Sequence, residues 1–157
     1  MGNVWASNKT IRDFHEFELW HKLLQYGLSP SGEWAMWRIQ AAEKTDTLFV
    51  RHIASGKEFK YKNTSAPEFS KDSHWIVFSE PAGGNAAAGI AYQVKLVCLA
   101  NGEEQIFRGM ESFTFTNDSK HLILKGVNTE NAVELNLYDL EKKRVKNIAN
   151  IQEYTVD

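Results

Sequence analysis

A ten-residue pattern occurs three times in this chain, and it constrains the fold more than any other feature of the sequence. The copies are LSPSGEWAMW at Leu28–Trp37, FSKDSHWIVF at Phe69–Phe78 and FTNDSKHLIL at Phe115–Leu124. Each copy has an apolar residue, a serine or threonine, a polar turn and then a run of strand-forming residues. The copies begin 41 and 46 residues apart. This spacing indicates a structural unit that is repeated along the chain.

The polar stretch inside each copy predicts a tight turn. Asp72 and Asp118 can bond to backbone groups two residues further on, while Pro30 and Gly32 favour the same reversal in the first copy. The run that follows is apolar at successive rather than alternate positions, as in Trp75–Phe78. Such a run predicts a strand that is buried on both faces, so other sheets must cover it on either side.

A second strand pattern recurs downstream in each unit, at residues 48–53, 94–99 and 135–140. The first two are followed by turn sequences. Asn101-Gly102 is a strong hairpin signal and Ser55-Gly56 is a weaker one. The third runs into Glu-Lys-Lys-Arg at residues 141–144 and has no glycine. We therefore expect its turn to differ from the other two.

Each unit thus contains about four strands, and four-stranded units repeated every ~40–45 residues are typical of β-propeller blades. The sequence predicts an all-β fold, a partial β-propeller of about three four-stranded antiparallel blades, preceded by a short N-terminal helix or strap. The predicted blades span residues 28–64, 65–109 and 110–150 of one propeller domain fragment. Residues 151–157 resemble the opening of the third blade, and they are predicted to form the first strand of an incomplete fourth blade.

Two further segments lie outside this pattern. Residues 1–27 only partly follow a helical period, and they are interpreted as a strap or helix whose Phe14, Phe17, Trp20 and Leu24 pack on the first blade. Pro81–Ala91 consists of small residues without a period, which predicts a flexible hairpin tip.

Composition excludes several classes of function. The chain has 157 residues, which is one domain by length, and a net charge of −2 without a long basic run, which argues against nucleic acid as the main partner. No apolar run approaches the ~18 residues of a membrane span. The first ten residues lack the plan of a secretory signal. Cys98 is the only cysteine, so no internal disulfide is possible, and we expect it to be a small buried apolar residue.

The motifs of common catalytic sites are not found, and no catalytic, cofactor-binding or metal-binding residue is predicted. His15 and His21 are six residues apart, which does not place them on one helix face. His52, His74 and His121 lie on or beside predicted strands. His74 and His121 occupy nearly equivalent turns, so convergence on a metal is one interpretation, and surface or edge histidines are the one we favour.

Three other groups have a structural and a functional interpretation. Glu103-Glu104 suits a solvated hairpin better than an anchor for a substrate amine. Ser70-Lys71-Asp72 resembles the Asp-box turn of sialidases, but the glycine and aromatic residue of that motif do not follow. The tryptophans and phenylalanines of the repeats are expected in the blade core rather than in a ligand cage.

The three blade motifs are variants of the S-P-D-G-K-x-hydrophobic pattern of the propellers of prolyl oligopeptidase-family serine peptidases and of TolB-type propellers. A strap containing Trp20 is followed in order by LSPSGEW, DTLFVRHIASGKEFKY and APEFSKDSHWIVFSEP. This order resembles the start of bacterial prolyl oligopeptidase-family peptidases over nearly the whole chain. The first copy departs from the pattern, because Ser31 stands where the family prefers aspartate.

The resemblance implies a non-catalytic N-terminal propeller segment that caps the active site of a serine peptidase and filters its peptide substrates. The implied partners are the remaining blades and a C-terminal α/β-hydrolase domain, which carries the Ser-His-Asp triad in that family. A TolB-like propeller scaffold for protein–protein binding is the alternative. Family analogy suggests the periplasm or the exterior of a bacterium. Three blades do not close a ring, so self-association through the open blade edges is also expected.

Overall fold

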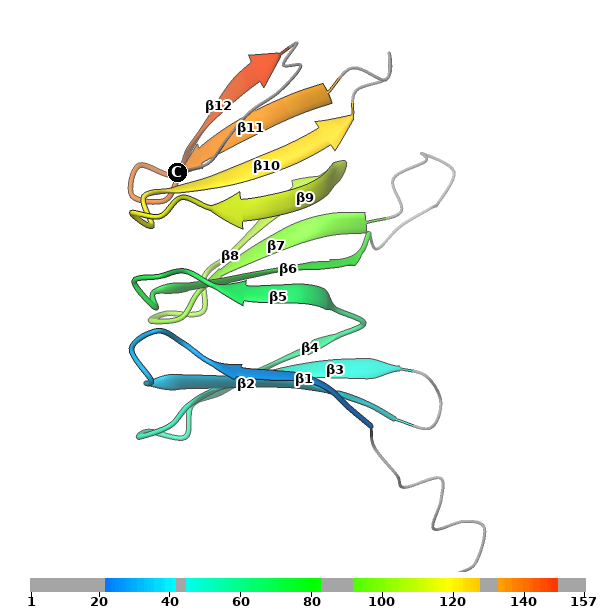
Figure 1. The fold of residues 1–157 in the computed structure, drawn as a ribbon, viewed down its shortest axis with the longest axis vertical. Coiled ribbons are helices and arrows are strands. Elements are labelled where there is room, and N and C mark those ends of the chain that lie inside the picture. The colour runs from blue at the N-terminus through cyan, green and yellow to red at the C-terminus, as the bar shows by residue number, and fades with distance from the viewer. Residues whose placement is uncertain (1–21, 42–44, 83–91, 128–132, 150–157) are drawn as a thin grey trace, which may run out of the picture.

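The computed structural model describes residues 22–41, 45–82, 92–127 and 133–149, and these residues form twelve strands in three separate sheets (Figure 1). The first sheet contains β1 (Lys22–Leu28), β2 (Trp34–Gln40), β3 (Asp46–His52) and β4 (Glu58–Lys62). The second contains β5 (Ser65–Phe69), β6 (Trp75–Pro81), β7 (Tyr92–Cys98) and β8 (Glu104–Arg108). The third contains β9 (Met110–Phe115), β10 (His121–Val127), β11 (Val133–Asp139) and β12 (Arg144–Ala149).

Strands that follow one another in the chain are also neighbours in each sheet, and all pairs are antiparallel. The sheets lie one above another in chain order (Figure 1). This arrangement confirms the predicted all-β partial propeller with three four-stranded antiparallel blades. We call the three sheets blades 1, 2 and 3. Among the described residues, no helix is long and apolar enough to cross a membrane.

The N-terminal boundary differs from the expectation. Residues 22–27, which we assigned to a strap or helix, belong to β1 and pair with β2. A register shift between Leu23 and Gln25 marks a bulge in this strand, and such a bulge weakens the two-residue period by which a strand is recognised. The other predicted strap residues, Phe14, Phe17 and Trp20, lie outside the described residues, as do the predicted strand 151–157 and most of the loop at 81–91.

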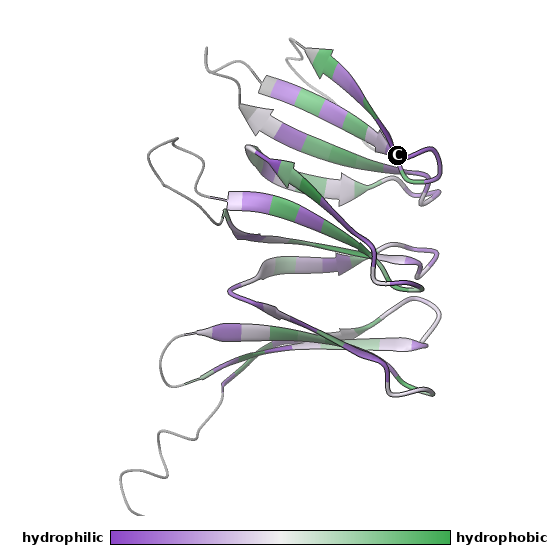
Figure 2. Ribbon diagram, turned by 180° about the vertical axis from the view of Figure 1, so that it is seen from behind, coloured by the Kyte–Doolittle hydropathy of each residue, from purple (hydrophilic) through white to green (hydrophobic). Residues whose placement is uncertain are grey.

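The core lies in two seams, one between each pair of neighbouring blades. Side chains that point to opposite faces of blade 2 enter different seams, as the alternation of a strand requires. On β6, Ile76 and Phe78 pack against blade 1, while Val77 packs against blade 3. All three are completely buried, which confirms the predicted burial on both faces. In Figure 2 green and purple bands alternate along several strands, so hydrophobic and hydrophilic residues follow one another there.

Two turns of each blade lie at the same end of the molecule (Figure 1). The first turns join the first and second strands, at residues 29–33, 70–74 and 116–120. The second turns join the third and fourth strands, at residues 53–57, 99–103 and 140–143.

The first turns are closed by the hydrogen bonds that their sequences predict. The backbone N–H of His74 donates to Asp72 Oδ1 at 3.1 Å, and that of Lys120 donates to Asp118 Oδ1 at 3.0 Å. The Thr116 hydroxyl also donates to Asp118 Oδ1, and with the Lys120 N–H it holds the pKa of that carboxyl below its usual value. In blade 1, Ser31 Oγ takes the place of the carboxylate and accepts from the backbone N–H of Glu33.

The second turn of blade 3 differs from the other two in its hydrogen bonds, as predicted, but it shares one backbone conformation with them. Its Lys143 has a φ of 53°, in the left-handed region that Gly56 and Gly102 occupy in blades 1 and 2. The turn is stabilised by Asp139 Oδ1, which accepts hydrogen bonds from the backbone N–H groups of Glu141 and Lys142. A side-chain cap therefore stabilises this turn, because an aspartate can accept hydrogen bonds from turn N–H groups.

Candidate functional site

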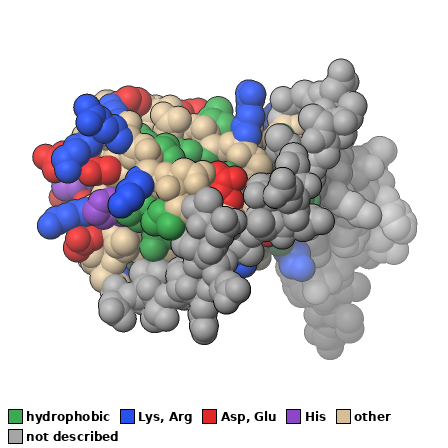
Figure 3. All heavy atoms as spheres, turned by 90° about the horizontal axis from the view of Figure 1, so that it is seen from above, with side chains coloured by type: hydrophobic (Ala, Val, Ile, Leu, Met, Phe, Trp, Pro, Cys, Tyr) green, Lys and Arg blue, Asp and Glu red, His purple; other side chains and the backbone are tan. Residues whose placement is uncertain are grey.

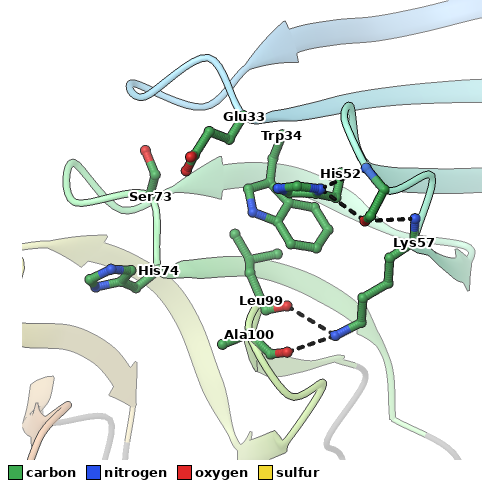
Figure 4. Close-up of a pocket in the computed structure, with 9 residues that line it drawn as sticks. Glu33, Trp34, His52, Lys57, Ser73, His74, Leu99 and Ala100 are labelled. Atoms are coloured by element: carbon green, nitrogen blue, oxygen red, sulfur yellow. Dashed lines mark hydrogen bonds between the residues drawn. The ribbon is translucent and has the colours of Figure 1, made fainter.

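A cavity of about 290 Å³ opens between blades 1 and 2, at the end of the seam where the turns lie. We call it the seam cavity. Blade 1 supplies five of its residues and blade 2 supplies four. They are Glu33, Trp34, His52, Ser55 and Lys57, and Ser73, His74, Leu99 and Ala100. The first turns and the second turns of both blades bring these side chains together (Figure 4).

Aromatic packing fixes the wall of the seam cavity. The Trp34 indole is buried, stacks on Phe59 with ring centroids 5.8 Å apart, and meets the His52 ring edge-on at 4.9 Å. In Figure 4 Glu33 and His74 lie on one side of this indole and Lys57 lies on the other. The cavity therefore has a carboxylate and an ammonium group on opposite sides of an aromatic wall.

The polar groups of the seam cavity are held by bonds to turns. Lys57 Nζ donates to the carbonyl of Ala100 at 2.7 Å and thereby joins the second turns of blades 1 and 2. The backbone N–H of Ser55 donates to His52 Nδ1 at 3.2 Å, so in the neutral ring the proton is on Nε2. The Ser55 hydroxyl lies 2.9 Å from the same Nδ1. Among the described residues no acidic group pairs with the other nitrogen of His52, so this Ser–His contact is a turn cap without the third member of a triad.

The first turns also bond to each other across the seams. The backbone N–H of Ser31 donates to Ser73 Oγ at 2.9 Å, and the backbone N–H of Asp72 donates to Ser119 Oγ at 3.1 Å. Both acceptor serines have a positive φ, 62° for Ser73 and 54° for Ser119. Blade 1 has Gly32 at the matching position, with a φ of 75°. Serine is unusual in this region. Here its hydroxyl accepts the hydrogen bond from a backbone N–H of the preceding blade.

A group of charged residues lies between blades 1 and 2 further along the seam. Lys95 Nζ is 3.1 Å from both Glu80 and Glu104, and its side chain is only 14% exposed. Burial lowers the pKa of Lys95, but its hydrogen bonds to the two carboxylates outweigh this effect and raise it overall. The Tyr61 ring of blade 1 lies beside this ammonium group. Burial, together with Glu104 and Glu80, raises the pKa of the Tyr61 hydroxyl well above its usual value.

The histidines named from the sequence are not brought to one place. His52 and His74 line the seam cavity, whereas His121 lines a different hollow on the outward face of blade 3. No group of three or more His, Cys, Asp or Glu side chains within the described ranges could hold a metal ion. His15 and His21 lie outside those ranges.

Several other interpretations can now be placed. Ser70 and Asp72 stabilise their own turn. Glu103 is exposed, as expected of a hairpin, and its carboxylate binds Lys143 of blade 3 at 2.6 Å. Glu104 belongs instead to the Lys95 group. Cys98 is half-buried, which contradicts the prediction of a buried residue.

The large aromatic residues of the repeats belong mainly to the seams. Trp34, Phe69, Phe78 and Phe115 are buried there, as predicted. The two serines with positive φ were not found from the sequence. The available signal was the alignment of Ser73 and Ser119 with Gly32, since a glycine in a turn indicates a left-handed residue.

The arrangement of the three blades was compared with known proteins. No family model and no curated protein matches the chain. Among solved structures, the β-propeller domain of the Trilobed protease from Pyrococcus furiosus aligns with a TM-score of 0.63 and 15% identity, over 84% of this chain and 43% of that one. The fold is that of a partial β-propeller.

Two multidomain peptidases contain the same propeller fold. An acylaminoacyl peptidase from Pyrococcus horikoshii aligns with a TM-score of 0.55 and 14% identity, over 87% of this chain and 26% of that one. Prolyl oligopeptidase B from Galerina marginata aligns with a TM-score of 0.60 and 14% identity, over 86% of this chain and 23% of that one. The chain thus spans less than half the length of each of these three structures, and the likeness concerns their propellers.

Proposed function

We propose that this chain is a non-catalytic propeller segment of a prolyl oligopeptidase-like serine peptidase, in which it caps the active site and filters peptide substrates. One observation carries the proposal. Three blades are joined in series by a repeated turn-to-turn seam, and their arrangement matches the propellers of peptidases that also contain a catalytic domain. The partners that this function requires are further blades and an α/β-hydrolase domain that carries the Ser-His-Asp triad.

The first strands of the blades are the proposed lining of the substrate passage. The blades of a propeller surround a central channel, and we place β1, β5 and β9 beside it. The Gln25 side chain on β1 donates to the carbonyl of Pro67 on β5 at 3.4 Å, which supports the approach of these first strands. Their exposed residues include Tyr26, Glu68 and Glu111. A passage lined in this way would admit extended peptides and exclude folded proteins by size.

The test is labelling of the native polypeptide from its source with a fluorophosphonate probe, which reacts with activated serines of hydrolases. An antibody raised against this chain isolates the polypeptide, and its intact mass is then measured. We expect a labelled polypeptide several times heavier than 17.9 kDa. An unlabelled polypeptide of any mass would reject the peptidase assignment and favour a binding propeller.

A denatured sample provides the matched control, because only a folded catalytic domain activates its serine. Loss of the label after heating would show that the reaction reports an active site. A label that persists after denaturation would show nonspecific modification, and the peptidase assignment would then be rejected.

A further inference from the structure

Blade 1 exposes two apolar positions that are buried in the other blades. Leu28 is 64% exposed, whereas its counterparts Phe69 and Phe115 are 9% and 6% exposed. Ile53 is 56% exposed, whereas its counterparts Leu99 and Leu140 are 1% and 4% exposed. In blades 2 and 3 these residues are covered by the preceding blade. The outward face of blade 1 is therefore one half of a seam whose other half is not formed by the described residues.

The backbone holds Ile53 in the same position as its buried counterparts. Its N–H donates to the carbonyl of Glu33 at 2.8 Å. The equivalent bonds join Leu99 to His74 and Leu140 to Lys120, both at 2.9 Å. Ile53 is therefore already placed as Leu99 is, and it is exposed because no blade formed by the described residues covers it. We call Ile53 and its turn the plug.

Blade 3 presents the opposite half of a seam on its outward face. A hollow of about 300 Å³ there is lined by His121, Leu137, Asp139, Lys142, Arg144, Val145 and Lys146. Four of these residues lie 87 positions after Trp34, His52, Ser55 and Lys57, the residues by which blade 1 lines the seam cavity. The hollow therefore corresponds to the blade-1 half of the seam cavity, and no described residue supplies its second half. We call it the socket.

The surface around the socket suits a seam. Figure 3 looks onto this side of blade 3, where hydrophobic side chains lie among polar ones, and Lys, Arg, His, Asp and Glu side chains gather at the turn end. Val145 and Ile148 of β12 are 54% and 38% exposed. Exposed apolar residues grouped on a protein surface are typical of a site that binds another protein.

Glu33, which lies beside the plug, complements the charge of the socket. In the seam cavity, blade 2 contributes Ser73, His74, Leu99 and Ala100. Blade 1 has Gly32, Glu33, Ile53 and Ala54 at the corresponding positions. Docked in the socket, Glu33 would bring a carboxylate to Arg144 and Lys146, whereas Lys142 already pairs with Asp139 at 3.3 Å. Opposite charges across an interface favour the correct partner and speed association.

We propose that a second copy of this chain docks head to tail, with the plug of blade 1 of one molecule in the socket of blade 3 of the other. Arg144 would then contact the carbonyl of Ala54, as Lys57 contacts that of Ala100 within one molecule. One seam bond would be missing, because Gly32 has no hydroxyl to accept from the N–H of Asp118. Head-to-tail contacts close into a ring if the rotation permits and otherwise extend into a chain.

The proposal concerns the 157-residue chain by itself, because the further blades that the proposed function requires would cover both faces in a longer polypeptide. The first measurement is the mass of the 157-residue protein by sedimentation velocity and light scattering between about 1 and 200 µM, the range of ordinary protein association. We expect a mass of twice 17.9 kDa if two copies close a ring of six blades, and larger multiples if they do not. A monomer at all concentrations would overturn the proposal.

Variants at each end make the test specific. Ile53→Asp removes the plug and Leu137→Asp removes the socket. Each variant alone is expected to be monomeric, and an equal mixture is expected to form dimers and nothing larger, because one plug and one socket remain. Arg144→Glu is a second socket variant at an exposed position, and it answers the objection that Leu137→Asp fails to fold. Ile106→Asp, on β8 of the middle blade, is the matched control and should associate like the natural protein.

Two results would contradict the head-to-tail arrangement. The first is association of Ile53→Asp to the same mass as the natural protein. The second is a mixture of the plug and socket variants that stays monomeric although each variant is folded by circular dichroism. Either result would mean that the two faces do not recognise each other.

Discussion

Replacement of Ser73 separates the two contributions that this residue makes to stability. Its hydroxyl accepts the backbone N–H of Ser31 across the first seam at 2.9 Å, and its backbone has a φ of 62°. Ser73→Ala removes the hydroxyl but leaves a side chain in the left-handed region. Ser73→Gly removes the hydroxyl and also relieves the backbone. The two variants therefore differ mainly in the backbone contribution.

The expected magnitudes follow from these two effects. A net intramolecular hydrogen bond contributes about 1 kcal/mol, and a residue other than glycine in the left-handed region costs about 1–2 kcal/mol. Ser73→Ala should thus lower the free energy of unfolding by about 1 kcal/mol, which is the hydrogen bond alone. Ser73→Gly should leave it almost unchanged, because the lost bond and the relieved backbone are of similar size.

Urea denaturation followed by tryptophan fluorescence measures these differences. Gly32→Ala calibrates the backbone effect, because a Cβ at Gly32 would have no heavy atom within 4 Å and its φ is 75°. Its cost should therefore be about 1–2 kcal/mol, from the backbone alone. The reasoning would be refuted if Ser73→Ala were as stable as the natural protein and Ser73→Gly were more stable by the full cost of Gly32→Ala. The seam hydroxyl would then contribute nothing.

Two further substitutions test the first seam. Gly102→Ala should lower the free energy of unfolding by about 2–4 kcal/mol, because a Cβ at a φ of 80° would lie 2.9 Å from the Phe59 ring. Gly56 has a similar φ of 74°, but its Cβ would have its nearest contact at 3.6 Å. Gly56→Ala should therefore lower the free energy of unfolding by only about half as much in the same urea titration. Raised pKa values of Tyr61 and Lys95 in the folded state stabilise the protein fully below their unfolded values of 10.0 and 10.5, and this stability is lost as the pH rises above them. Tyr61→Phe should therefore make the decline in melting temperature between about pH 9 and pH 11 shallower. An unchanged slope would show that the pKa of Tyr61 is the same in the folded and unfolded states.

The repeat identified the blades because each unit contains the same short pattern of turn and strand residues. The Ser/Thr-x-Asp turns and the apolar runs after them depend on residues within five positions of each other, so they can be predicted from the sequence. The burial of Ile76, Val77 and Phe78 on both faces followed from their consecutive apolar character. These features led to the stacked sheets.

The seam contacts could not be predicted in the same way, because they join residues more than forty positions apart. Ser73 could not be recognised as an acceptor until the first turn of blade 1 lay beside it. Lys95 would be taken for a surface residue, yet Glu80 and Glu104 hold it in a half-buried position. The left-handed conformation of Lys143 in the second turn of blade 3 was not expected, because the sequence has no glycine there.

The connections between blades are extremely short. Asn63 and Thr64 join β4 to β5, and Gly109 alone joins β8 to β9. Short tethers hold two binding surfaces at an effective concentration of the order of millimolar or more. A seam that opens by thermal motion therefore closes again onto the same neighbour, and exchange of a blade with another molecule requires the strands themselves to unfold. Intact connections should therefore matter for protease resistance as much as the seams do. After a single cut at Gly109, blades 2 and 3 would no longer be tethered and could diffuse apart.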